Sequence, residues 1–234
     1  MLKFNRLNFL LIVLISHMAL GYVLIFGSLS QILATILLFI VECSFCSTAV
    51  YHRLISHRSW TAPRFIEIIG TLGGIFTFTG TPITRTLSHR YHHKYADTQL
   101  DPHSPKVMGL FMTYFPMLVK NRKMSLKLVP DLLHDPLYKF CHANYFYIII
   151  LTFTGFYLLF GLQWAVALVL APGALTWMNI SICNIFCHSG KNELIVKRIA
   201  EQKLILENLI GLLETNEAND NAPEMMTELK ALKA

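Results

Sequence analysis

Residues 89 to 103 read His-Arg-Tyr-His-His-Lys-Tyr-Ala-Asp-Thr-Gln-Leu-Asp-Pro-His, the stretch of the chain that is richest in histidine. Its first three histidines, His89, His92 and His93, stand at i, i+3 and i+4, which places them on one face of a helix. A face of imidazoles is a poor packing surface and a good ligand set for a transition metal. The spacing therefore predicts a helix that contributes to a metal site.

A second, shorter histidine cluster precedes this stretch. His52 and His57 lie in the sequence Tyr-His-Arg-Leu-Ile-Ser-His-Arg-Ser. Five imidazoles in two clusters, on a chain that is otherwise mostly apolar, predict a metal site at the edge of a membrane. The alternative is a polar, solvated loop that happens to be rich in histidine.

The composition is that of a membrane protein. Of the 234 residues, 54% are hydrophobic and 15% are charged, whereas a soluble domain carries about a quarter charged residues. A transmembrane helix needs about 20 apolar residues. The predicted fold is all-α and integral to the membrane, with four transmembrane helices and a cytoplasmic helical cap that carries the histidine clusters. The expected spans cover about residues 5–27, 31–50, 145–160 and 165–187.

The segments between the second and third spans are expected at the membrane surface. Residues 62–84 are apolar but interrupted by glycine and proline, which favours an interfacial or re-entrant helix. Residues 104–142 are mixed and basic, with amphipathic pieces, and are expected to be helical. Three histidines are expected to be surface residues: His103, His134 and His142.

The basic residues indicate the orientation of the chain. Two Lys or Arg residues precede the first span, twelve lie between residues 51 and 144, and six follow His188. The short turns at 27–30 and 161–164 contain none. The positive-inside rule then places both termini and the histidine clusters in the cytoplasm. The net charge of +6 also suits contact with an anionic membrane or an acidic partner.

Two spans contain residues that are unusual in hydrocarbon. Glu42 lies inside the second span, where an ionisable side chain faces the bundle interior by default. It either lines a substrate path or forms a structural hydrogen bond. Pro172-Gly173 is expected to kink the fourth span, because proline removes a backbone donor.

The two histidine clusters together resemble those of a known enzyme family. HRLxxHR at residues 52–58, followed by HRxHHxxxDxxxDPHS at residues 89–104, is similar to the histidine boxes of membrane-embedded acyl-lipid and acyl-CoA desaturases of the stearoyl-CoA desaturase type, including short bacterial and phage versions. The resemblance runs from about residue 5 to residue 190. It implies an oxidoreductase that holds two iron ions and uses O2 to introduce a double bond into a fatty acyl chain. Side chains alone cannot break an unactivated C–H bond, so such a reaction requires a metal.

The resemblance also implies which residues form the site. The metal ligands would be His52, His57, His89, His92, His93 and His188, with Asn184 near the second iron. Asp97 and Asp101 would accept N–H bonds from ligating histidines, although Asp101-Pro102 is also a common turn sequence. Thr176-Trp177 would border the bend of an acyl tunnel, and a Trp anchor at the membrane interface is the alternative.

The sequence departs from the family after His188. The family has a third box, HxxHH, further along the chain, but no histidine follows His188 here. Residues 191–234 are expected to form a divergent cytoplasmic tail after a membrane domain at 1–190, with a helix at about 192–213. Three acidic residues stand where the box is expected: Glu214, Glu217 and Asp220. They either substitute as iron ligands or form a solvated acidic tail, and the second iron site is expected to be weak or empty.

The expected partners are those of a membrane desaturase. They are a fatty acyl substrate linked to CoA, a carrier protein or a lipid, and an external electron donor such as ferredoxin or cytochrome b5. The sequence shows no Gly-rich phosphate loop and no nucleic-acid-binding motif, so no nucleic-acid partner is expected. Two alternatives stay open. One is a catalytically incomplete homologue with a structural or regulatory role, and the other is an acyl hydroxylase on the same scaffold.

Overall fold

The structure, a computed structural model, describes residues 6–96, 98–119 and 124–189, with side chains described up to Phe186. Every regular element in these residues is a helix, which confirms the all-helical prediction for this part of the chain. The chain divides into two compact units, Met1–Phe186 and Cys187–Ala234. The predicted tail helix and the three acidic residues that follow it lie outside the described residues.

Three helices are long and apolar enough to cross a membrane. The first is α1, Arg6–Phe26, and the second is α2, Leu29–Val41, which continues into the π-helix η1, Glu42–Ser56. The third is built from α9 (Leu162–Ala165), the π-helix η5 (Val166–Leu170) and α10 (Ala171–Ser189). These helices match the first, second and fourth predicted spans. The second ends at Ser56 rather than near residue 50.

The third predicted span is a shorter helix. α8, Tyr145–Phe160, has 16 residues, about 24 Å at 1.5 Å per residue, against about 30 Å of hydrocarbon. It follows α7, Pro136–Ala143, at a bend of 71°. A second bent pair joins α3 (Arg64–Gly74) and its extension η2 (Ile75–Thr77) to α4 (Pro82–Lys94), at 81°. Counting each bent pair as one span gives up to five spans in the described residues.

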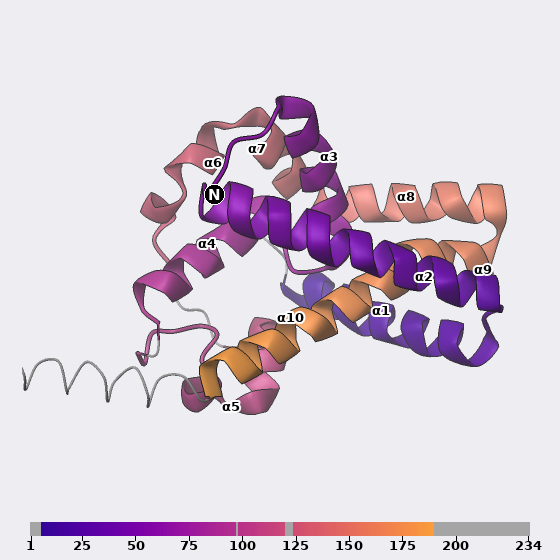
Figure 1. Ribbon diagram of the computed structural model, residues 1–234, viewed down its shortest axis with the longest axis horizontal. Coiled ribbons are helices and arrows are strands. Elements are labelled where there is room, and N and C mark those ends of the chain that lie inside the picture. Colours follow the sequence, from indigo (N-terminus) through magenta and orange to yellow (C-terminus); the bar gives the residue numbers. More distant parts are fainter. Residues whose placement is uncertain (1–5, 97, 120–123, 190–234) are drawn as a thin grey trace, which may run out of the picture. The chain divides into compact units, whose positions relative to one another are not determined.

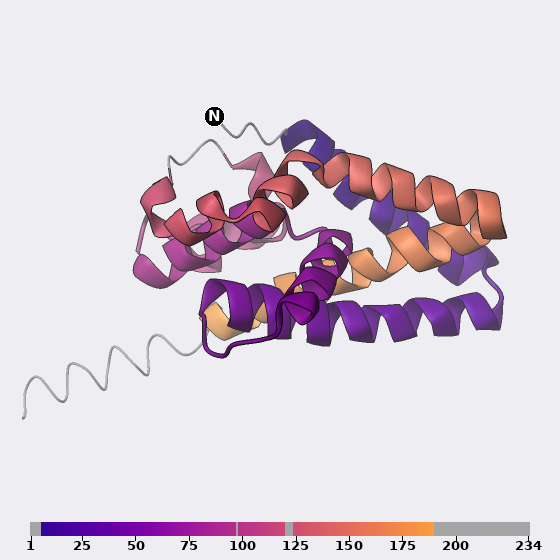
Figure 2. The ribbon, with the colours of Figure 1, turned by 90° about the horizontal axis from the view of Figure 1, so that it is seen from above.

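The long helices pack around the π-helix η5. α1, α2 and α8 each contact it (Figure 1), and Figure 2 shows α8 and α2 on opposite sides of α10. The Thr35 hydroxyl of α2 donates to the Ala167 carbonyl at 2.8 Å, which gives a carbonyl of η5 a partner. The position of the expected kink, Pro172-Gly173, lies close to the C-terminal end of η5. There the Ala171 N–H donates to the Val166 carbonyl, a bond that spans five residues as in a π-helix. Large apolar side chains on the outer faces are exposed, as lipid contact requires: Leu24, Leu37, Ile150 and Leu158.

Local capping fixes where the histidine-bearing helices begin. Ser28 accepts the Gln31 backbone N–H, and the Gln31 side chain accepts the Ser28 N–H in return. Thr81 and Thr84 form the same reciprocal pair at the start of α4, where Pro82 occupies the first turn. The first cap begins the helix that continues into η1, and the second begins α4, which carries His89, His92 and His93.

A set of short helices lies between α4 and α8. These are α5 (Pro105–Tyr114), η3 (Pro116–Leu118), η4 (Leu126–Leu128), α6 (Pro130–His134) and α7. In both views α4, α6 and α7 gather near one end of the long helices (Figure 1, Figure 2). The described part of residues 104–142 is thus largely helical, as predicted.

Candidate metal centre

The π-helical backbone of η1 brings the first two histidines together. In an α-helix, residues five apart lie about 140° apart around the axis, so His52 and His57 would face different directions. Here the His57 N–H donates to the His52 carbonyl at 3.0 Å, a bond that spans five residues. This register stacks the two residues on one side of the helix. Their Nε2 atoms lie 2.9 Å apart.

The histidines of α4 meet those of η1 through His89. His89 and His93 are four residues apart on α4, and their Nε2 atoms lie 3.1 Å apart. The Nε2 atom of His89 also lies 2.9 Å from that of His57. One nitrogen from each of four imidazoles therefore points into a common space, although the two pairs come from different helices.

We call His52, His57, His89 and His93 the four-histidine cluster. Their ligand atoms all lie within 4.8 Å of one another. With N–metal bonds of about 2.0–2.1 Å, two nitrogens on one ion can be at most about 4.2 Å apart, so a shift of well under 1 Å would fit all four. Lone pairs that face one another repel unless a proton or a cation lies between them. The donor set suits zinc, copper, nickel or iron, and the exposure of His57 and His93 leaves an open side.

His92 is held apart from this cluster. Its Nδ1 atom lies 2.7 Å from the Asp101 carboxylate, and both side chains are buried. Its ring centroid is 5.3 Å from that of His93 and 6.3 Å from that of His89. A carboxylate at Nδ1 favours the tautomer with the lone pair on Nε2 and orients the ring, as carboxylates do for metal-ligating histidines. His92 is therefore oriented by Asp101 and lies outside the four-histidine cluster.

Two predicted surface histidines are in fact buried. His103 is 8% exposed because the Asp101-Pro102 turn folds it back. Its backbone N–H donates to Asp101 at 2.8 Å, and its ring packs on His92 at 5.4 Å. His142 is also 8% exposed, and its Nδ1 atom lies 2.7 Å from the Thr81 hydroxyl. The surface predictions for both are wrong, whereas His134 is exposed as predicted.

The residues predicted to line an acyl tunnel lie inside the bundle. The Thr176 hydroxyl donates to the Glu42 carboxylate at 3.3 Å and also contacts the Pro172 carbonyl at 3.2 Å. Trp177 is 5% exposed and packs edge-on against Phe9 at 5.9 Å. An interfacial anchor would face the lipid headgroups, so this burial favours an interior role for Trp177. The bond to Thr176 shows that Glu42 has at least a structural role.

Six predicted site residues remain. Asn184 is described and is half-buried on α10. The others lie outside the residues whose side chains are described: Asp97, His188, Glu214, Glu217 and Asp220.

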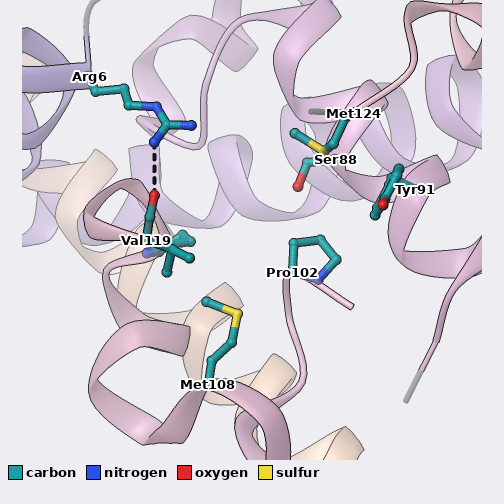
Figure 3. Close-up of a pocket in the computed structure, with 8 residues that line it drawn as sticks. Arg6, Ser88, Tyr91, Pro102, Met108, Val119 and Met124 are labelled. Atoms are coloured by element: carbon teal, nitrogen blue, oxygen red, sulfur yellow. Dashed lines mark hydrogen bonds between the residues drawn. The ribbon is translucent and has the colours of Figure 1, made fainter. Parts of the chain in front are cut away.

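A small cavity lies beside α4, the helix that carries His89, His92 and His93 (Figure 3). It has a volume of about 90 Å³ and is lined by Ser88 and Tyr91 of α4 together with Pro102, Met108 and Met124. Arg6 closes one edge by donating to the Val119 carbonyl at 2.8 Å.

One structural group near the cluster was only partly indicated by the sequence. Arg58 and Arg90, which directly follow His57 and His89, both form ion pairs with Asp131 of α6. The paired His-Arg dipeptides were a visible hint. Asp131 was not, because its distance along the chain from either arginine follows no periodicity.

Comparison with known proteins identifies relatives of the chain. No protein-family model matches it. The probable chloroplastic lipid desaturase ADS3.2 of Arabidopsis thaliana is 32% identical over 150 residues, which are 60% of this chain and 41% of that protein. The acyl-CoA C20 Delta5-desaturase of Anemone leveillei is 31% identical, covering 60% and 47%, and Delta-9 acyl-lipid desaturase 1 of Arabidopsis thaliana is 31% identical, covering 59% and 48%. The chain thus spans less than half the length of these curated relatives.

The fold and the cluster define a class, a helical membrane protein with a group of histidines that could hold a metal ion. Over about 60% of its length the chain is similar to several proteins named as acyl-lipid and acyl-CoA desaturases, which are oxidoreductases. These matches confirm the resemblance predicted from the histidine motifs.

Proposed function

We propose that the protein is an O2-dependent, di-iron desaturase that introduces a double bond into a lipid acyl chain. The observation that supports this most is the convergence of four imidazole nitrogens, from two separate helices, within 4.8 Å. The printed names of the relatives point to lipid-linked and CoA-linked acyl chains as the substrate class.

The side chains divide between two proposed ions. The four-histidine cluster would hold the first iron. His92, Asn184 and His188 would contribute to the second, with Glu214, Glu217 and Asp220 as further donors if the tail supplies them. Iron with O2 would provide the oxidising power that breaking an unactivated C–H bond requires.

Other residues would orient the ligands and hold the substrate without binding the iron. Asp101 accepts the His92 Nδ1–H and so fixes which nitrogen carries the lone pair. The apolar interior around Thr176 and Trp177 would hold the acyl chain and exclude water. An acidic electron donor such as ferredoxin or cytochrome b5 would meet the basic residues of the cap.

We further propose four spans, with both termini and the histidine boxes in the cytoplasm. Twelve basic residues lie between residues 51 and 144 and six follow His188, whereas the turns at 27–30 and 161–164 contain none. Reporter fusions at Ser28 and Gln163 are expected to report the non-cytoplasmic side. A cytoplasmic signal from either site would contradict this topology.

Expression in a host that lacks desaturases tests the proposed activity. Gas chromatography of the lipid acyl chains is expected to show a new unsaturated species with the parent chain. The same analysis should show none with His57→Ala, while the exposed His134→Ala keeps the product. Hydroxylated chains instead would identify an acyl hydroxylase. Absence of any product from a folded, iron-containing chain would favour a catalytically incomplete homologue.

A further inference from the structure

The two histidines that bridge the boxes are each followed by an arginine. His57 and His89 face each other through their Nε2 atoms at 2.9 Å. Arg58 and Arg90, the next residues, both reach the carboxylate of Asp131. One acidic side chain on α6 thus joins the two helices that carry the four-histidine cluster.

Arg90 makes the closer connection because all of its donors are used. A guanidinium has five N–H groups in a fixed planar fork. Two of them bind the Asp131 carboxylate in a bidentate pair at 2.8 and 2.9 Å. The other three bind the carbonyls of Ser56, Ile55 and Leu128 at 2.9, 2.9 and 2.8 Å.

The carbonyls that Arg90 binds define its mechanical role. Ile55 and Ser56 are the last residues of η1, the helix that presents His52 and His57. Carbonyls at a helix end lack partners within the helix, so a donor from elsewhere anchors that end. Arg90 lies on α4, between His89 and His93. It therefore fixes the end of one histidine helix directly onto the other.

The two ion pairs to Asp131 differ in exposure. The side chains of Arg90 and Asp131 are 18% and 22% exposed, whereas Arg58 is 61% exposed. Solvent screens the Arg58 pair, so most of the positioning falls to Arg90. Burial raises the pKa of Asp131, but hydrogen bonds from Arg90 and Arg58 outweigh it and hold that pKa below its usual range. The carboxylate is therefore ionised at neutral pH.

We propose that Arg90 and Asp131 are positioning residues that set the separation of the two histidine boxes, and so the metal affinity of the four-histidine cluster. None of the described hydrogen bonds or ion pairs of Arg90 and Asp131 is to an imidazole, and both residues act through the backbone ends they join. A metal site tolerates displacements of only about 0.5 Å in its ligands. The inference rests on the metal-binding part of the proposed function, and not on the reaction.

The test is a titration of the full-length protein in detergent with Co²⁺, whose visible absorption reports its coordination. Arg90→Lys keeps the charge but loses the fork, and Asp131→Asn keeps the shape but loses the charge. Each is expected to weaken Co²⁺ binding by on the order of 10-fold or more and to change the absorption spectrum. The double variant should be little weaker than either single variant, because the two residues act as one unit.

Asp135→Asn is the matched control. Asp135 pairs with Arg64 at 2.7 Å and also caps α7, and its described side-chain bonds involve neither η1 nor α4. It is expected to lower the unfolding temperature while leaving the Co²⁺ affinity within about 2-fold of the parent, because it shares no bonding partner with Arg90 or Asp131.

Three outcomes would overturn the proposal. They are parent-like Co²⁺ binding by folded Arg90→Lys and Asp131→Asn, an equal loss of affinity in Asp135→Asn, and no Co²⁺ binding by the parent. A parent that binds Co²⁺ and responds to both substitutions, yet forms no unsaturated lipid, would refute the proposed reaction and support the positioning role.

Discussion

Replacing His57 with alanine is expected to lower metal binding at the four-histidine cluster by at least 10–100-fold, the range commonly lost with even an indirect partner of a metal site. His57 is central because its Nε2 atom lies 2.9 Å from that of His52 and 2.9 Å from that of His89. Its loss removes one donor and the link between the two boxes. Metal per chain, measured by mass spectrometry after equilibration with limiting Fe²⁺ under anaerobic conditions, checks this result.

The control for this experiment is another histidine of the same cap. His134 is exposed, and its ring contacts only its own helix, through the Pro130 carbonyl at 2.6 Å, among the described hydrogen bonds. His134→Ala should bind as much iron as the parent. Equal iron in His57→Ala and His134→Ala would show that the convergence of imidazoles does not create a metal site.

The sequence predicted those helices that depend only on a sufficient length of apolar residues. Residues 6–26 need only enough apolar length to span hydrocarbon, and the structure has a helix there. The number of spans could not be predicted in this way, because α8 is short and meets α7 at a bend of 71°. Such a bend depends on packing against neighbouring helices, which hydropathy does not report.

The π-helix could not be predicted from the histidine spacing. His52 and His57 are five apart, a spacing that an ordinary α-helix would spread over two faces. Local sequence offers only a partial hint. The hydroxyls of Thr48 and Ser56 donate to carbonyls five residues back, of Cys43 and Tyr51, at 2.7 Å each. Hydroxyls of this kind occur in ordinary helices as well, so the tertiary fold decides.

Burial of polar residues was the least predictable property. His103 lies in a polar stretch of the sequence and His142 in a mixed one, yet both are buried by contacts with distant or turned-back segments. The hydrogen bond between His142 and Thr81 joins residues 61 apart. Asp131 was missed for the same reason, since its bond to Arg90 spans 41 residues. Periodicity describes one helix at a time and does not predict contacts between residues of different helices.

The second substitution with a large expected effect separates the two proposed ions. Replacing His92 with alanine should abolish unsaturated product while leaving the four-histidine cluster with its metal. His92 lies outside the group of four donors, and Asp101 orients it from the opposite side of the ring at 2.7 Å. Two-metal sites need both ions, so loss of the second should reduce turnover by more than about 100-fold.

Metal content and product measured on the same preparation distinguish these roles. His92→Ala is expected to fall from about two bound irons per chain to about one, because the cluster has four donors without it. If the second site is weak from the start, the parent itself holds close to one iron, and His92→Ala then loses product with little change in iron. His57→Ala, by contrast, should lose both. Asp101→Asn should lie between the parent and His92→Ala in activity, since it leaves the imidazole but weakens the carboxylate that orients it. Loss of the cluster's metal in His92→Ala would show that His92 and the four-histidine cluster form a single site, and the division into two ions would be wrong.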